Sequence, residues 1–413
     1  MTNHNFEPIT PEKKQQLEEM MAHPLWTAFP QSVEDSYRFG WARSTCFLAD
    51  TLYFGNWYKW LTILGKGEWK KGDPYPYVTI SESGNEAVKK MLKKSFEPVS
   101  YKGVRPYEFL SWIGYAIGLA WFEKPNMDKD SWEHLYRTFD FSLFYQFPSD
   151  YLSVFLAENG SSGALDYYPT PLSLSKAMNL MLQGDEEEKV LTDLMYDPCT
   201  GTGALILPSK SLNIVASDLS HLMVRAAAIQ AFFYKPSVIY VPRPIIGIHA
   251  DPKELRINKY FEFDVNSRIY QGDALTGEFI APVNIFLEGS EFVDVYFHPL
   301  NLKKHKIYDY EQELAKPWNT IEREKQIEIV AAMAREIMPD QTISNPPFNM
   351  KMPKREQENI QSIIRSNKEF IDSRKGNSMM NLFNQIQTEA AAKTEFILAN
   401  STGKNKEQLM FVF

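Results

Sequence analysis

The chain has 413 residues, of which 44% are hydrophobic and 23% charged, and its formal net charge is −8. This length predicts two domains, and the composition is typical of a globular protein rather than a disordered one. Two cysteines without CxxC spacing argue against a disulfide framework or a zinc site and favour a reducing cytoplasm. The acidic balance argues modestly against a protein that grips DNA alone.

Residues 1–160 are expected to form a mainly helical N-terminal domain. Helical periodicity occurs at Glu12–Met21, Glu86–Lys94 and Arg105–Phe122. The longest apolar run, Phe109–Phe122, is too short to span a bilayer and predicts a buried helix. The N-terminus lacks the basic and apolar regions of a signal peptide, so we expect a cytoplasmic protein with no membrane partner.

The pattern changes after Glu158–Gly163, a small, polar and glycine-rich stretch that predicts a linker. We expect helices at Leu172–Leu182, His221–Phe233 and Ile321–Ile337, and strands at Val190–Tyr196, Leu212–Ser217, Arg268–Gln271, Thr342–Ser344 and Glu395–Leu398. Strand, turn, helix and strand in this order form a βαβ unit, which predicts an α/β domain with a parallel sheet over residues 161–413. An extra hairpin is expected at Val283–Leu287 and Val293–Phe297.

A glycine-containing turn follows the first of these strands, in the segment Asp197-Pro-Cys-Thr-Gly-Thr-Gly203. Gly201 and Gly203 permit a tight turn where a Cβ would keep a ligand away from the backbone. The helix expected after the turn offers free amides to an anionic group. A dinucleotide fingerprint requires a third glycine where this chain has Ile206, so a different nucleoside ligand is favoured.

Asp218 ends the second strand, 21 residues after Asp197. A carboxylate at this point in a nucleotide-binding α/β fold accepts hydrogen bonds from both ribose hydroxyls. The alternative is that Asp218 caps the helix that begins after Leu219.

A third motif, Ser344-Asn-Pro-Pro-Phe348, follows a predicted strand. The two prolines end the strand, because proline has no backbone N–H to donate and keeps the residue before it extended. The Pro346 carbonyl and the Asn345 amide oxygen could then hold one amino group, with Phe348 stacked on a base. A simple loop with a core phenylalanine is the alternative.

Together these motifs resemble those of the N6-adenine DNA methyltransferases. Asp197–Gly203 is followed downstream by Asn345–Phe348, and upstream Tyr168-Pro-Thr-Pro171 is similar to the methionine-binding motif of that family. The nearest resemblance is to the methylation subunits of type I restriction-modification systems. It implies a Rossmann-like core that uses S-adenosyl-L-methionine, preceded by a helical domain, and it covers only residues 165–280 and 340–400.

The resemblance also implies residue roles. Thr170 and the turn would hold the methionine end of the cofactor, Asp218 the ribose, and Asp273 the adenine amino group. The implied cofactor-binding residues are Tyr168, Thr170, Asp197, Cys199, Thr200, Gly201, Gly203, Asp218, Asp273 and Ala274. The implied catalytic residues, which receive a flipped target base, are Asn345, Pro346, Pro347 and Phe348. We expect no metal, since the histidines show no ligand spacing.

Two features depart from the family pattern. Asp273 and Asn345 lie 72 residues apart, which predicts an insertion at about 280–338. Only 65 residues follow Phe348, which leaves no room for a target-recognition domain. Specificity for DNA would then come from a partner subunit or from the insertion and N-terminal domain. The remaining alternatives are RNA or protein glutamine as the substrate, and an inactive relative that serves assembly.

Overall fold

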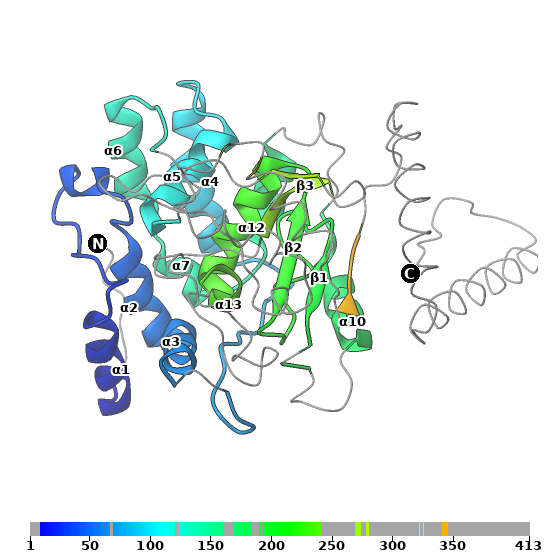
Figure 1. Ribbon diagram of the computed structural model, residues 1–413. Coiled ribbons are helices and arrows are strands. Elements are labelled where there is room, and N and C mark those ends of the chain that lie inside the picture. The colour runs from blue at the N-terminus through cyan, green and yellow to red at the C-terminus, as the bar shows by residue number, and fades with distance from the viewer. Residues whose placement is uncertain are drawn as a thin grey trace, which may run out of the picture. The chain divides into compact units, whose positions relative to one another are not determined.

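The computed structural model describes residues 9–66, 69–119, 122, 124–159, 169–182, 190–191, 193–240, 269–273, 278–280, 322, 325 and 341–345. The chain divides into two compact units, Met1–Met350 and Lys351–Phe413, and every described residue belongs to the first. That unit is mixed α/β, with many helices and a small, mostly parallel sheet (Figure 1).

The first part of the chain is helical, as predicted. Its elements are α1 (Pro11–Met21), the 3₁₀ helix η1 (Glu34–Tyr37), α2 (Arg43–Tyr53), α3 (Asn56–Lys66), α4 (Glu86–Ser100), α5 (Pro106–Ile117), α6 (Lys129–Thr138), α7 (Ser142–Gln146) and α8 (Tyr151–Glu158). Several of these helices begin at side-chain caps: Thr10, Asn85 and Asp128 accept hydrogen bonds from backbone N–H groups of the first turns of α1, α4 and α6. Such caps satisfy donors that the helix itself leaves unpaired.

Helix α5 confirms the buried helix predicted from the apolar run, but it ends at Ile117 rather than Phe122. Gly118 adopts a left-handed conformation with φ 74° and ends the helix. The buried guanidinium of Arg43 donates hydrogen bonds to the carbonyls of Ile117 (3.2 Å) and Gly118 (2.7 Å). A positive charge at this end is favoured by the helix dipole.

Aromatic side chains join the helical region to the sheet region in one hydrophobic core. The Phe144 and Phe233 rings stack with centroids 4.6 Å apart. The indole N–H of Trp57 donates to the Phe232 carbonyl at 3.0 Å, and that of Trp60 donates to the Tyr240 carbonyl at 2.6 Å. The high aromatic content of the chain therefore serves a packed interior shared by both regions.

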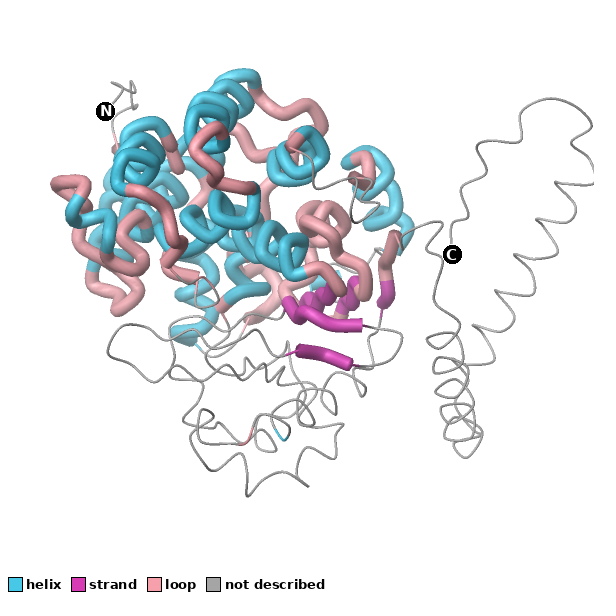
Figure 2. The backbone as a smooth tube through the Cα atoms, turned by 90° about the horizontal axis from the view of Figure 1, so that it is seen from above, coloured by secondary structure: helices cyan, strands magenta, loops and turns pink. Residues whose placement is uncertain are grey.

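The sheet has five strands in the order β4-β3-β2-β1-β5, and Figure 2 shows them gathered in one part of the described structure. The strands are β1 (Met195–Asp197), β2 (Ile214–Asp218), β3 (Ile269–Asp273), β4 (Glu278–Ile280) and β5 (Gln341–Thr342). β1 pairs in parallel with β2 and with β5, and β2 pairs in parallel with β3. The short strand β4, which the sequence did not predict, pairs antiparallel with β3. The predicted parallel sheet is confirmed.

Three helices surround the sheet: α10 (Leu172–Leu182), α12 (His221–Tyr234) and α13 (Pro236–Ile239). α12 lies against β2 and β3, and its buried face continues into contact with α5. The predicted bounds of α10 are confirmed, and α12 is one residue longer than predicted.

Two predictions near β1 were wrong in detail. Val190 and Leu191 are helical, and β1 begins only at Met195, since an apolar run alone does not distinguish a strand from a buried helix. The segment after the glycines forms turns from Gly201 to Pro208 rather than a regular helix. Pro208 cannot donate the backbone hydrogen bond that would extend the one helical turn from Gly203.

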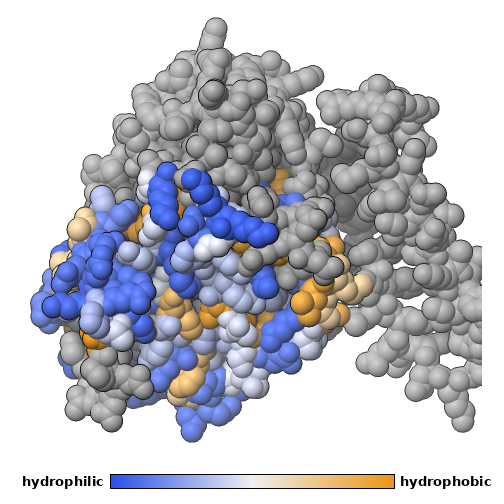
Figure 3. Space-filling view, turned by 90° about the horizontal axis from the view of Figure 1, so that it is seen from below, coloured by the Kyte–Doolittle hydropathy of each residue, from blue (hydrophilic) through white to orange (hydrophobic). Residues whose placement is uncertain are grey.

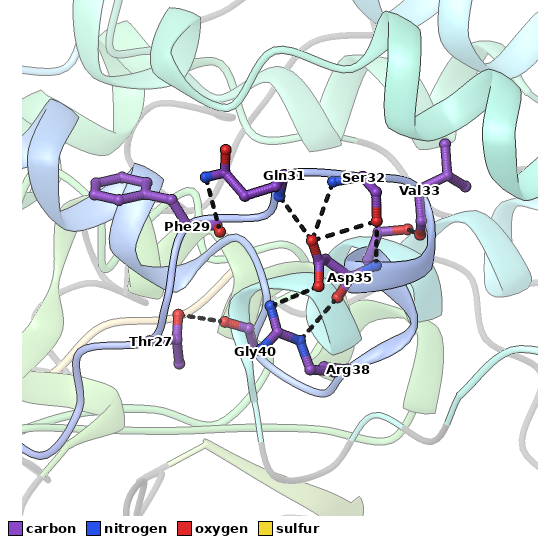
Figure 4. Close-up of polar contacts among 9 residues, drawn as sticks. Thr27, Phe29, Gln31, Ser32, Val33, Asp35, Arg38 and Gly40 are labelled. Atoms are coloured by element: carbon purple, nitrogen blue, oxygen red, sulfur yellow. Dashed lines mark hydrogen bonds and ion pairs between the residues drawn. The ribbon is translucent and has the colours of Figure 1, made fainter.

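Polar clusters on the helical region have structural roles. Figure 4 shows the Asp35 carboxylate accepting the backbone N–H groups of Gln31 (2.8 Å) and Ser32 (3.1 Å), with Arg38 at 3.3 Å. These backbone hydrogen bonds and the Arg38 charge hold the pKa of Asp35 below its ordinary value.

The face in Figure 3 is largely hydrophilic, with small separate apolar patches. Among the described helices, none is long and apolar enough to cross a membrane.

Candidate functional site

Polar residues gather where the four parallel strands end. Asp197, Asp218 and Asp273 are the last residues of β1, β2 and β3, and Ser344-Asn345 follows β5 after one buried residue. Because these strands are parallel neighbours, their carboxyl ends lie along one edge of the sheet. This edge is where open α/β sheets bind ligands.

The glycine turn is fixed to β2 by three hydrogen bonds, one of which the Ser217 hydroxyl donates to the Pro198 carbonyl at 3.2 Å. The Gly201 N–H donates to Oδ2 of Asp218 at 2.8 Å, and the Thr200 N–H donates to the Ser217 carbonyl at 2.9 Å. Gly201 and Gly203 have φ values of +53° and +96°, as a tight turn at this point requires. A Cβ at Gly203 would come within 3.3 Å of the Ile206 side chain.

Asp218 orders the turn rather than capping α12. Its Oδ1 accepts the Ser220 N–H at 2.8 Å, and Ser220 is the residue that caps α12 by accepting the Met223 N–H. Burial raises the pKa of Asp218 above its ordinary value. Each carboxylate oxygen keeps acceptor capacity beyond its one backbone donor, so this side chain can still receive hydroxyl groups.

Asp197 is fully buried beside this turn. Its Oδ1 accepts the Cys199 N–H at 3.1 Å, while its Oδ2 has no hydrogen-bond partner among the described residues. Burial, followed by repulsion from Asp218, raises the pKa of Asp197 to about 8. The Thr200 side chain lies beside Asp197 and lowers its pKa by hydrogen bonding. Within the same described part of the chain, the Ser344 hydroxyl oxygen is also buried without a partner. Buried polar atoms of this kind are costly unless a ligand or water satisfies them.

The structure brings together two motifs that are far apart in the sequence. Nδ2 of Asn345 donates a hydrogen bond to Oγ1 of Thr170 at 2.8 Å, although 175 residues separate them. This hydrogen bond orients the side-chain amide of Asn345: Nδ2 points at Thr170, and Oδ1 stays available as a hydrogen-bond acceptor. A fixed amide oxygen of this kind can accept a hydrogen bond from an amino group.

Residues that the sequence did not single out support the turn from behind. Nε2 of Gln230, in α12, donates to the Thr202 carbonyl (2.8 Å) and to Oδ1 of Asp150 (2.8 Å). The Ser153 hydroxyl, in α8, contacts both Asp150 and the Thr202 hydroxyl. A buried glutamine inside the apolar run of α12 is the signal that could have identified this support.

Leu219, directly after Asp218, is a second residue that the sequence did not single out. Its side chain is 60% exposed although it is large and apolar. Next to a carboxylate that can receive hydroxyl groups, it offers an apolar surface to a flat ring. An apolar residue placed directly after the strand-ending acid is the signal that could have identified it.

Several predicted site residues lie outside the described residues. They are Tyr168, Ala274, Pro346, Pro347 and Phe348, together with the side chain of Asp273, whose backbone ends β3. Of the predicted residues that are described, Thr170 and Asn345 meet each other, and Asp197, Cys199, Thr200, Gly201 and Asp218 form one hydrogen-bonded turn with Gly203 beside it.

No family model matches the chain, and no curated protein or solved structure matches it. The residues of this edge are therefore the indication of what the chain does. In the described part of the chain, no group of three or more His, Cys, Asp or Glu side chains is arranged to hold a metal ion. The chemistry at the edge is that of buried carboxylates, hydroxyls, turn amides and one amide oxygen.

Proposed function

We propose that this chain is an S-adenosyl-L-methionine-dependent methyltransferase that acts on the N6 amino group of adenine in DNA. The observation that carries the proposal is the hydrogen bond between Asn345 and Thr170. It joins the motif expected to hold the target amino group to the motif expected to hold the cofactor. A transferase needs its two ligands side by side, because the reacting atoms must lie within about 3–3.5 Å.

The order of the parallel strands supports a Rossmann-like core. Counting only β1, β2, β3 and β5, the sheet reads third, second, first and fourth along the chain. This is the order of one half of a doubly wound nucleotide-binding sheet together with the first strand of the other half, and the ligand of such a sheet lies outside the carboxyl ends of the strands. The acidic residue at the end of the second strand is Asp218, in the position suited to a ribose.

The residues at this edge fit S-adenosyl-L-methionine. The buried Asp197 carboxyl and the neighbouring Thr200 hydroxyl offer polar groups where the amino-acid end of the cofactor would bind. Asp218 offers acceptors for ribose hydroxyls, and the exposed Leu219 offers an apolar surface to the adenine ring. The cofactor, when bound, supplies an electrophilic methyl group on a sulfonium.

The work of the chain itself is positioning. Oδ1 of Asn345, oriented through Nδ2 and Thr170, accepts a hydrogen bond from the exocyclic amino group and keeps the nitrogen lone pair directed at the methyl carbon. Pro346 adds a carbonyl acceptor and Phe348 a stacking surface in this proposal. The base leaves the duplex for this pocket at a cost of a few kcal/mol. The chain's acidic net charge of −8 favours help from a DNA-binding partner subunit.

The test uses methyl-labelled S-adenosyl-L-methionine with unmethylated DNA, RNA or a protein lysate, followed by digestion and identification of the labelled product. We expect label in N6-methyladenine of DNA. Asn345→Ala should reduce transfer by about 100-fold or more, as is typical when one positioned hydrogen-bonding group of an active site is removed. Asn159→Ala, a change of the same residue type at the end of α8, serves as the matched control.

Each other outcome has a defined meaning. Label in RNA or in protein glutamine would support the proposed cofactor and methyl transfer but show that DNA is not the substrate. Cofactor binding without transfer to any substrate, even with added candidate partners, would favour an inactive assembly subunit. Transfer unaffected by Asn345→Ala would show that the amino group is held elsewhere.

A further inference from the structure

A cavity lies away from the candidate site, between α3 and the loop that leads to α4. Its volume is about 290 Å³, and it is lined by Lys59, Trp69, Gly72, Asp73, Pro74, Tyr75 and Tyr77. The ammonium groups of Lys210 and Lys235 lie 6.0 and 5.6 Å from the Tyr77 ring centroid. Lys210 precedes β2 closely, so the cavity is near the amino edge of the sheet, opposite the candidate site.

The walls of this cavity are held by hydrogen bonds. The indole N–H of Trp69 donates to the Asp73 carbonyl (3.2 Å), and the Lys70 N–H donates to Oδ2 of Asp73 (3.1 Å). The Tyr77 N–H donates to Oδ1 of Asn56 at 3.1 Å, and Asn56 is fully buried. The Tyr75 and Tyr77 ring centroids are 6.4 Å apart. Three aromatic side chains are thus presented on a fixed loop.

The charge around the cavity is positive. The one lining carboxylate, Asp73, is paired with Lys66 at 3.6 Å, which leaves Lys59 as the lining charge. Burial lowers the pKa of Lys59, and the buried Asp50 nearby opposes this shift. Burial raises the pKa of Asp50 to about 7, so this carboxyl carries only part of a negative charge near pH 7. Lys70 and Lys71 are exposed on the same loop.

We infer that this cavity binds a nucleotide, with the base against the aromatic side chains and the phosphate near Lys59 and the lysines around it. Aromatic rings with neighbouring cations are the combination by which proteins bind single-stranded nucleic acid and nucleotides. Rings can also enclose a methylated ammonium group, but the Lys210 ammonium group already lies beside Tyr77 and would repel a second cation. Lys235, on the same ring, is fully buried, its Nζ donates to the Ser209 carbonyl, and burial lowers its pKa to about 7. The volume, near the lower end of ligand sites, suits one nucleotide. This inference does not depend on methyl transfer.

The nucleotide can be free or part of a strand, and two probes separate these sources. The full chain is mixed with a fluorescein-labelled single-stranded oligonucleotide carrying one 5-iodo-deoxyuridine, and binding is followed by anisotropy. Ultraviolet crosslinking and mass spectrometry then locate the contact, with adenosine monophosphate as competitor. We expect crosslinks at Trp69, Tyr75 or Tyr77. If adenosine monophosphate binds and the oligonucleotide does not, the site takes a free nucleotide.

Tyr75→Ala and Lys59→Met should each weaken binding about tenfold, in the range measured for lost base stacking. Tyr101→Ala, at a tyrosine that is 82% exposed on another helix end, and Lys93→Met are the matched controls. Thermal unfolding of each variant verifies that it folds.

Crosslinks confined to other segments, equal binding by all four variants, or no binding of either probe would overturn the inference. So would stronger binding of choline than of adenosine monophosphate. Asn345→Ala should leave this binding unchanged, so that failure of the proposed methyltransferase and failure of this site give different results.

Discussion

The two edges of the parallel sheet differ in the kind of ionisable side chain that they carry. The carboxyl edge carries Asp197 and Asp218, whose pKa values are raised by burial, beside the buried Ser344 hydroxyl. The amino edge carries Lys210 and Lys235 around the Tyr77 ring, next to a cavity with a further lysine. The first edge suits a ligand with hydroxyl and amino donors, and the second suits an anion with a flat ring.

This difference would allow an acidic chain to act on nucleic acid, as we propose for this protein. A net charge of −8 opposes binding of phosphates by the molecule as a whole. Attraction depends on local charge, and the amino edge concentrates cations while the carboxyl edge concentrates acids. The two edges should therefore respond to separate substitutions, and the following predictions test that separation.

The largest effect is expected for Asp218→Ala. It removes the acceptor of the Gly201 N–H and the proposed ribose acceptors, so affinity for S-adenosyl-L-methionine should fall by about 100-fold, the sum of two hydrogen bonds to a charged group. Isothermal titration calorimetry measures the change. Lys59→Met, at the other edge, should leave this affinity unchanged, and an equal loss in both variants would refute the separation of the edges.

The pH dependence of stability should reveal the buried acid Asp197. Its folded pKa of about 8 lies above the ordinary aspartate value of 3.8, which applies to the unfolded chain. The folded state therefore retains a proton that the unfolded state has lost, and the stabilising contribution, complete below pH 3.8, is lost as the pH rises through about 8. Relative to Asp197→Asn, the wild type should lose about 2 kcal/mol between pH 6 and pH 8. Urea unfolding at several pH values measures this, and parallel curves for the two proteins would exclude a raised pKa.

Gly203→Ala should damage the turn more mildly. Gly203 has a φ of +96°, and a Cβ there would lie 3.3 Å from Ile206. The strain should cost about 1 kcal/mol of unfolding free energy and lower cofactor affinity about tenfold. Thermal unfolding and calorimetry give the two numbers. Gly65→Ala, where a Cβ meets nothing within 4 Å, is the control and should change neither.

The smallest effect is expected for Thr170→Val. It removes the acceptor of the Asn345 amide and so loosens the orientation of Oδ1, which should slow methyl transfer by up to tenfold, the worth of one neutral hydrogen bond. Thr170→Ser keeps the hydroxyl and should restore the rate. Single-turnover kinetics with saturating cofactor separates this loss from weaker binding. Failure of serine to rescue the rate would assign Thr170 a packing role instead.

Much of the fold could be read from local patterns. The bounds of α10 and the starts of α4 and α12 follow from hydrophobic period and cap residues. The strand β4 could not be predicted, because its three residues are too few to display the alternation of apolar and polar side chains that marks a strand. The turns after Gly203 replaced the expected helix, since Pro208 prevents its extension.

The candidate site was predictable in part, because some of its residues are marked by local sequence signals. Glycines and acids at strand ends are local signals, so Gly201, Asp197 and Asp218 stand in the sequence where the structure uses them. The support from Gln230 and Asp150 is not local, because it joins α12 to a residue 80 positions earlier. Only packing could reveal it.

The sequence by itself determined the elements, the glycine turn and the acids that end β1 and β2, because propensity, capping and turn chemistry depend on near neighbours. The tertiary structure alone decided that Asn345 meets Thr170, that Asp197 is buried deeply enough to raise its pKa to about 8, and that lysines gather around Tyr77. Burial and electrostatics depend on residues distant in the chain, and such contacts exist only once the sheet and helices have packed.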